Sequence, residues 1–155
     1  MLDHFTVSVI LESRPAKSEW AALNWDVVGL CNISGETLDV NSGSQITSAD
    51  DVNRYVYSGM NLQFFEDQCE SYYHNLMSPQ PSCYIIASQE DDERPEPFLV
   101  TMSFDEAHAY LEGDASIYSV PIPPELYQQV EAYVVENYSA EMRKKRKRVD
   151  WKEKR

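Results

Sequence analysis

The chain has few positive charges outside its C-terminal end. Residues 1–142 hold only four of the 13 Lys and Arg side chains, namely Arg14, Lys17, Arg54 and Arg94. Nearly all of the 26 Asp and Glu side chains lie in the same stretch. Because phosphate binding needs Lys and Arg, this scarcity argues against a nucleic-acid surface on residues 1–142.

Cysteines and long apolar runs are also scarce. The three cysteines, Cys31, Cys69 and Cys83, are odd in number and form no close pair. This argues against a disulfide framework and favours reduced, buried thiols in a cytosolic compartment. No apolar stretch approaches the ~20 residues that span a bilayer, and the N-terminus lacks the basic and apolar regions of a secretory signal. We therefore expect a soluble, cytoplasmic protein.

The sequence motifs of the common catalytic and cofactor sites are missing. The five glycines form neither a GxGxxG nor a Walker pattern, and the three histidines and three cysteines show no CxxC, HxxH or HExxH spacing. There is no GxSxG elbow for a serine nucleophile. The acidic run Glu90–Glu93 reads as a solvated loop, which does not separate two carboxyl pKa values as acid–base catalysis requires. We expect no metal, no cofactor and no enzymatic activity.

What the chain does have is an unequal division of charge. Residues 143–155 carry nine of the 13 cations and two of the 26 acids, so this tail has a formal charge of +7 and residues 1–142 one of −20. We interpret the chain as a single acidic domain, residues 1–142, followed by a basic tail, residues 143–155. Such an arrangement favours electrostatic contact with oppositely charged partners.

Several partners remain open for the tail. It could bind nucleic acid in a salt-sensitive way, touch anionic lipid, bind an acidic protein partner, or fold back on its own acidic domain. The charge of −20 opposes the first two, so protein contact or intramolecular docking is favoured. The tail residues expected to make the contact are Arg143, Lys144, Lys145, Arg146, Lys147, Arg148 and Trp151.

Residue patterns predict an α+β fold, with a small, mostly antiparallel sheet and about three helices. Strands are expected at 5–11, 26–33, 54–65, 83–87, 98–102 and 115–121. Helices are expected at 66–77, at 103–113 after the capping box Ser103-x-x-Glu106, and from Pro123-Pro124 onward. In the last helix Leu126, Val130, Tyr133 and Val134 are spaced to face a core.

Three stretches are expected to interrupt the regular elements. Residues 12–17 contain Arg14-Pro15 and should end the first strand. Residues 18–25 could form a short helical turn, and residues 34–53 read as a long polar connection with a short strand near 37–40.

A partner-binding surface is predicted on the first two helices and on two tryptophans. Trp20 and Trp25 are expected to pack in the core, with a recognition anchor as the alternative. The helices at 66–76 and 103–111 should present acids and tyrosines. The candidate residues on these helices are Glu66, Tyr72, Tyr73, Asn75, Asp105, Glu106 and Tyr110.

Several short sequence motifs of the chain together resemble those of a known family. They are Tyr72-Tyr73-His-Asn75-Leu76 before Ser78-Pro79-x-Pro81, Val100-Thr101-x-Ser103-x-Asp105-Glu106-Ala107, Val120-Pro121-x-Pro123-x-Glu125-Leu126, and Tyr138 before a Lys/Arg run. With the Val7-Ser-Val strand and Trp20…Trp25, the chain resembles a family of small uncharacterised proteobacterial proteins. Their genes tend to lie beside those for molybdenum- or tungsten-containing formate dehydrogenase.

The resemblance implies an accessory protein rather than a catalyst. We expect a cytoplasmic, non-catalytic accessory or assembly protein that acts by protein–protein contact, with a formate dehydrogenase subunit as its partner and no cofactor. The alternatives are a regulatory protein whose tail binds nucleic acid or another polyanion, an enzyme built on converging Cys and His residues, and a structural subunit of a larger complex.

Overall fold

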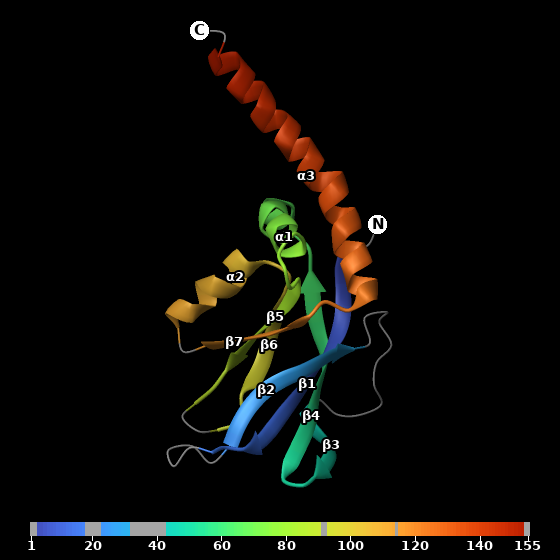
Figure 1. Ribbon diagram of the computed structural model, residues 1–155, viewed down its shortest axis with the longest axis vertical. Helices are drawn as coiled ribbons and strands as arrows, with labels where there is room; N and C mark the ends of the chain where they lie inside the picture. The colour runs from blue at the N-terminus through green and yellow to red at the C-terminus, as the bar shows by residue number, and fades with distance from the viewer. Residues whose placement is uncertain (1–2, 18–22, 32–42, 91–92, 114, 154–155) are drawn as a thin grey trace.

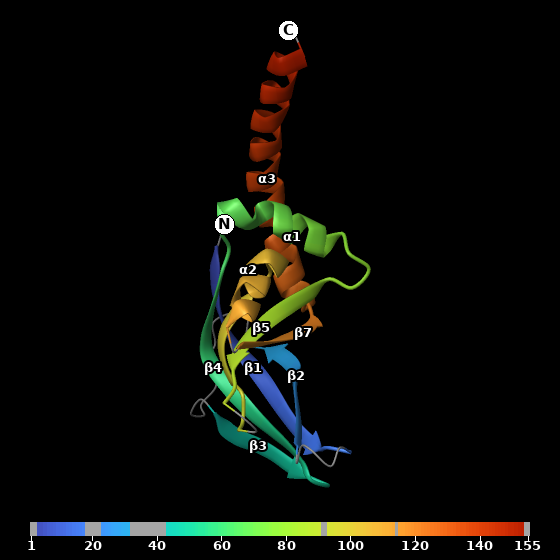
Figure 2. The ribbon, with the colours of Figure 1, turned by 90° about the vertical axis from the view of Figure 1, so that its left-hand side faces the viewer.

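The structure is a computed structural model that describes residues 3–17, 23–31, 43–90, 93–113 and 115–153, and for 112 and 139–153 the backbone path alone. Within these residues the chain forms two antiparallel sheets and three α-helices, which confirms the predicted α+β class. The two sheets replace the single sheet that the sequence predicted. Figures 1 and 2 show both sheets in the lower part of the molecule and a long C-terminal helix above them.

The first sheet has four strands in the order β2-β1-β4-β3. They are β1 (His4–Pro15), β2 (Leu23–Cys31), β3 (Ser44–Ala49) and β4 (Val52–Gln63). The predicted strands are confirmed over 5–11 in β1, 26–31 in β2 and 54–63 in β4, whereas 64–65 lie beyond the end of β4 and 32–33 lie outside the described residues. The predicted helical turn at 18–25 is wrong for Leu23–Trp25, which belong to β2, and residues 18–22 lie outside the described residues.

The central strand β1 is longer than its apolar pattern indicates. Val7, Val9 and Leu11 are fully buried in the core. The predicted end after Leu11 is wrong, because the strand continues to Pro15, which pairs with Leu23 of β2. A proline is tolerated there since the strand ends at that residue and no further ladder bond needs its missing N–H.

β3 lies in a stretch that the sequence suggested was a connection. Four of its six residues are polar and five are exposed, and the strand forms the edge of the sheet. The hairpin to β4 turns at Asp50 and Asp51, with φ values of 52° and 65°. Two consecutive left-handed residues match a tight two-residue hairpin turn, and Asp tolerates that conformation better than most residues. The short strand predicted near 37–40 lies outside the described residues.

The second sheet has three strands in the order β6-β5-β7. They are β5 (Ser82–Ser88), β6 (Glu96–Thr101) and β7 (Ala115–Pro121), and the sequence predicted all three. Buried residues of both sheets, among them Val9 and Ile85, form one hydrophobic core. At the sides of the molecule β4 lies next to β6, and β2 next to β7.

The helices cover one end of the two sheets (Figures 1 and 2). They are α1 (Cys69–Leu76), which follows a 3-10 turn η1 (Glu66–Gln68), α2 (Phe104–Ala109), which continues into η2 (Tyr110–Glu112), and α3 (Pro124–Glu153). The predicted core positions of the last helix are confirmed, because Leu126, Val130, Tyr133 and Val134 are all buried. α3 runs through residue 142 without a break, so its backbone joins the acidic and basic segments.

An aromatic cluster joins the sheets to α1 and α3. The ring of Phe64, at the end of β4, lies 5.5 Å from Phe5, 5.8 Å from Tyr72 and 5.2 Å from Tyr133. Each of these side chains is at least nine-tenths buried. Edge-to-face and tilted ring pairs at this spacing stabilise beyond simple area burial. The cluster therefore fixes where α1 and α3 sit on the sheets.

Candidate functional site

α1 is held against the core by its inward residues, which leaves its other face exposed. The hydroxyl of Tyr72 is buried and accepts a hydrogen bond from the backbone N–H of Phe65 at 3.0 Å. Burial raises the pKa of Tyr72, so this phenol stays neutral. Glu66, Asp67 and Tyr73 are exposed on the outer side.

Asn75 ties the end of α1 to the second sheet. Its side-chain nitrogen donates to the backbone oxygens of Ser82 at 2.7 Å and Met102 at 2.9 Å, and its oxygen accepts from the N–H of Ser82 at 3.0 Å. Asn75 is 5% exposed. Asn75 and Tyr72 therefore do not lie on the surface that the sequence predicted for them, since the fold uses both side chains internally.

α2 begins at the predicted cap. The hydroxyl of Ser103 accepts a hydrogen bond from the N–H of Glu106 at 3.0 Å, which satisfies one of the open amides of the first turn. The N–H of Ser103 donates to Oγ1 of Thr101 at 3.0 Å instead of to Glu106. Of the two hydrogen bonds of the predicted capping box, the one from the N–H of Glu106 to the hydroxyl of Ser103 is therefore confirmed, and the one from the N–H of Ser103 to the side chain of Glu106 is replaced by the bond to Thr101.

Two side-chain contacts connect α1 to α2. The hydroxyl of Ser103 donates to Oε1 of Gln68, and the N–H of Asp105 donates to the hydroxyl of Ser71 at 3.4 Å. Ser71 and Ser103 are both buried. The two helices are thus held in fixed positions relative to one another, and so are the side chains that they expose.

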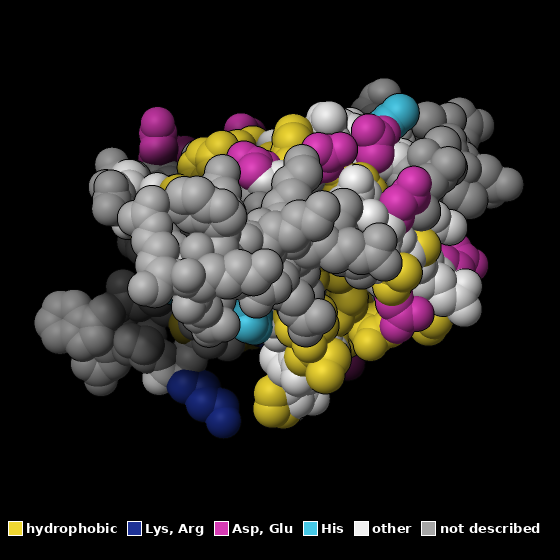
Figure 3. Space-filling model, turned by 90° about the horizontal axis from the view of Figure 1, so that it is seen from above, with side chains coloured by type: hydrophobic (Ala, Val, Ile, Leu, Met, Phe, Trp, Pro, Cys, Tyr) yellow, Lys and Arg dark blue, Asp and Glu magenta, His cyan; other side chains and the backbone are white. Residues whose placement is uncertain are grey.

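Acidic side chains gather on these two helices. Glu66, Asp67 and Asp105 are exposed, and Glu106 is half-buried. Burial raises the pKa of Glu106, and the nearby carboxylate of Asp67 raises it further against the lowering effect of a hydrogen bond with Thr101. Figure 3 shows acidic and hydrophobic side chains next to one another on the end of the molecule that carries α3. This end therefore exposes both carboxylates and apolar side chains.

Large hydrophobic side chains are also exposed on α2, on η2 and on the neighbouring strand β6. Phe98 is 49%, Phe104 49%, Tyr110 40% and Leu111 48% exposed. The rings of Phe98 and Tyr110 lie 5.6 Å apart, and the ring of His108 lies 3.8 Å from that of Phe104. We call these five residues, Phe98, Phe104, His108, Tyr110 and Leu111, the α2 patch. Side chains of this size so exposed in one region mark candidate interaction sites.

The other predicted site residues lie apart from these helices. Trp25 is half-buried, packs against the core and lies 5.9 Å from the ring of Tyr55. The guanidinium of Arg94 stacks on that tyrosine at 4.5 Å and donates to the backbone oxygen of Gly43 at 3.2 Å. Trp20 lies outside the described residues. The backbone of Arg143–Arg148 and Trp151 belongs to α3, and their side chains lie outside the described part.

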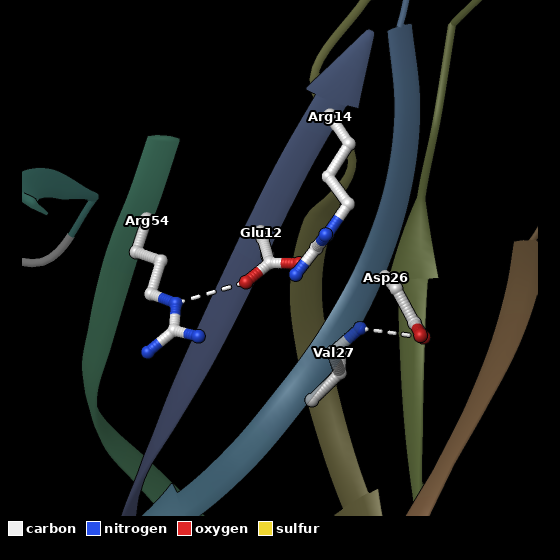
Figure 4. Close-up of polar contacts among 5 residues, drawn as sticks. All are labelled: Glu12, Arg14, Asp26, Val27 and Arg54. Carbon is white, nitrogen blue, oxygen red and sulfur yellow. Dashed lines mark hydrogen bonds and ion pairs between the residues drawn. The ribbon is translucent and has the colours of Figure 1, made fainter. Parts of the chain in front are cut away.

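Sequence reasoning missed an ion cluster on the first sheet (Figure 4). The carboxylate of Glu12 is 3% exposed, with Oε1 bound by Nε of Arg14 and Oε2 by Nε of Arg54 at 2.9 Å. Register places Arg54 directly across from Glu12. The arginine hydrogen bonds, first that of Arg14, hold the pKa of Glu12 below its ordinary value against the effect of burial. The only signal in the sequence was that Arg14, one of the four cations in residues 1–142, lies two residues from Glu12, because Arg54 lies 42 positions away.

This cluster predicts a specific acid sensitivity. Because the folded-state pKa of Glu12 is lowered, the stability it provides is complete above its unfolded pKa near 4.5 and is lost as pH falls through the lower folded value. We expect Glu12→Gln to lower the free energy of unfolding at pH 7 and to flatten its decline in the acid range. Chemical denaturation at a series of pH values measures both effects, and parallel curves for the two proteins would contradict this role.

Comparison with known proteins places the chain in a family. The family model described as protein of unknown function, DUF3305, matches residues 6–148. The chain belongs to the DUF3305 family. The match extends from residue 6 through Arg148, so it includes both described sheets apart from the first two residues of β1, the helices α1 and α2, and α3 up to the first six cations of the tail. No curated protein and no solved structure matches the chain.

Metal binding, cysteine reactivity and membrane insertion can each be assessed from the described residues. Among them no group of three or more His, Cys, Asp or Glu side chains is placed to hold a metal ion. Burial raises the pKa of the Cys31 thiol and raises that of Cys83 to about 12. A reactive cysteine needs the opposite shift. No described helix is long and apolar enough to cross a membrane.

Proposed function

We propose that this DUF3305 protein is a non-catalytic accessory or assembly protein that binds a partner protein through α1 and α2. The observation that carries the proposal is the fixed arrangement of exposed carboxylates and exposed aromatic rings on these helices. A preorganised surface loses little conformational entropy when a partner binds. Tyr is among the residue types enriched in the few positions that contribute most of the binding energy at protein interfaces.

The charge of the surface indicates a basic partner segment. Glu66, Asp67 and Asp105 would meet Lys or Arg on the partner, and Tyr73 and Tyr110 would cover the apolar stems of those side chains. Complementary charge of this kind raises association rates and favours correct partners more than it raises affinity. The same reasoning disfavours an acidic partner at this surface.

We propose a formate dehydrogenase subunit as the partner. The support is the resemblance to proteins encoded beside molybdenum- or tungsten-containing formate dehydrogenase genes. Basic features that suit an acidic surface are a twin-arginine leader or a basic cofactor entrance on that enzyme. The tail, residues 143–155, would then adjust association through its charge.

A second candidate function is binding of nucleic acid or another polyanion through the tail. It is favoured by the course of α3, whose C-terminal half projects away from the acidic domain and carries seven of the nine cations of the tail (Figure 1). Retention of the full chain on a polyanion matrix at about 0.15 M salt would support it. Elution well below that salt concentration would contradict it.

Partner binding predicts a charge-specific loss of affinity. We expect the triple variant Glu66→Gln, Asp67→Asn and Asp105→Asn to bind purified formate dehydrogenase about tenfold more weakly, since three exposed ion pairs at roughly 0.5 kcal/mol each total about 1.5 kcal/mol. Biolayer interferometry with immobilised chain measures the dissociation constant.

The matched control changes the same net charge at the opposite end of the molecule. Asp50→Asn, Asp51→Asn and Glu93→Gln alter exposed acids of the β3–β4 turn and of the segment before β6. Asn tolerates the left-handed backbone of positions 50 and 51. This control should bind as the unaltered chain does. Equal losses in both variants would contradict a site on α1 and α2, and no binding by the unaltered chain would contradict the choice of partner.

A further inference from the structure

The basic end of α3 projects beyond its own domain. Tyr138 is the last residue of the helix known to pack against the core, and the helix continues to Glu153. At 1.5 Å per residue, those fifteen residues extend about 22 Å. Figures 1 and 2 agree that this part points away from the sheets and from α2. A continuous helix therefore keeps the tail from the acidic surface of its own chain.

The α2 patch leaves a large apolar surface uncovered in the single chain. Four of its five side chains are large hydrophobic groups that are each 40–49% exposed. Phe104, His108 and Leu111 are spaced i, i+4 and i+7, which places them along one side of the helical segment. The segment from Phe104 to Glu112 has nine residues, so at the helical rise its length is about 14 Å. A helix of the length of the tail can cover it.

Acidic side chains border the patch, and cations dominate the tail. Asp105 is exposed and Glu106 half-buried within the same helix. Residues 143–155 have a formal charge of +7 and include Val149 and Trp151 among their cations. Exposed rings next to carboxylates can hold Lys and Arg by cation–π contact and by ion pairing, and they can also pack against an indole. The patch and the tail therefore complement one another in both charge and apolar character.

We propose that the basic tail of one copy docks on the α2 patch of a second copy. Exchange of both tails gives a closed two-fold dimer in which each copy supplies one tail and one patch. The dimer is expected at low salt, because exposed ion pairs are screened within a Debye length of about 10 Å at 0.1 M salt. Asp105 belongs to the surface proposed for partner binding as well, so self-association and partner binding would compete.

Sedimentation velocity of the full chain tests this dimer. We expect a dimer at about 0.05 M NaCl whose dissociation constant rises at least about tenfold by 0.5 M NaCl. A full-length variant with Gln at Arg143, Lys144, Lys145, Arg146, Lys147 and Arg148 should be monomeric at both salt concentrations. So should Phe104→Lys combined with Leu111→Lys, which removes two apolar side chains of the patch and places two positive charges where the cationic tail would dock.

A matched control and a mixing experiment separate the proposal from other modes of association. Val135→Lys changes a 64% exposed apolar residue of α3 outside the patch and should leave the dimer intact. A mixture of the tail variant, which keeps its patch, with the patch variant, which keeps its tail, should form a heterodimer with one tail–patch contact. A monomer at low salt, a dimer that survives either set of substitutions, or a mixture without heterodimer would each overturn the proposal.

The outcome is independent of the proposed accessory function. Binding of formate dehydrogenase to the monomeric tail variant would leave that function standing even if no dimer forms. Conversely, a dimer with the expected salt and variant behaviour would stand even if formate dehydrogenase does not bind.

Discussion

Asn75→Ala is expected to lower the free energy of unfolding by about 3 kcal/mol. The amide makes three hydrogen bonds to backbone groups of Ser82 and Met102 and is 5% exposed. Its removal leaves buried donors and acceptors without partners, and each such group costs roughly 1–3 kcal/mol. Urea denaturation followed by circular dichroism measures the change.

A matched control separates this effect from the loss of an asparagine in general. Asn61 lies exposed on β4, so Asn61→Ala should change stability by less than about 0.5 kcal/mol. If Asn75→Ala also cost so little, the amide would not be the tie between α1 and the second sheet. The fixed position of the α1 surface would then lose its explanation.

Phe64→Ala should produce the largest loss of stability, about 3–5 kcal/mol, as expected for a phenylalanine removed from a packed core. Phe64 is 2% exposed and lies at the centre of the ring cluster with Phe5, Tyr72 and Tyr133. Its loss removes packing from both sheets, α1 and α3 at once. The same denaturation measurement applies.

The neighbouring residue supplies the control for this prediction. Phe65 is 41% exposed, so Phe65→Ala should cost far less than Phe64→Ala although the side chains are identical. Where Phe64→Ala does not fold, Phe64→Leu retains most of the volume and should cost about 1–1.5 kcal/mol. Equal costs at positions 64 and 65 would contradict the burial difference on which the description of the core depends.

The sequence predicted the elements with strong periodicity and missed those without it. Leu126, Val130, Tyr133 and Val134 follow helical spacing, and their burial in α3 is confirmed. β3 gave no such signal, because an exposed edge strand has no apolar face to produce one. The division into two sheets depends on contacts between distant segments, which local patterns do not encode.

The roles of individual polar residues were harder to predict than the helices that carry them. Asn75 and Tyr72 looked like surface groups because both are polar and lie on an acidic helix. Their burial depends on backbone groups of Ser82, Met102 and Phe65, which only the tertiary fold brings to them.

Glu12 is the converse case. The segment 12–17, with Arg14-Pro15, predicted the end of β1, and the strand instead continues to Pro15 while Arg14 and Arg54 neutralise the buried carboxylate of Glu12. One of these arginines lies 42 positions away in the sequence. The pairing register between β1 and β4 therefore determines that Glu12 has an arginine partner, which composition does not encode.

Hydrogen–deuterium exchange of the full chain with and without purified formate dehydrogenase tests for a partner site on α1 and α2. We expect slower exchange on complex formation in residues 66–76 and 103–112, with little change in the β3–β4 hairpin at 44–63. Protection confined to that hairpin, or unchanged exchange throughout α1 and α2 at saturating enzyme, would contradict a partner site on these helices.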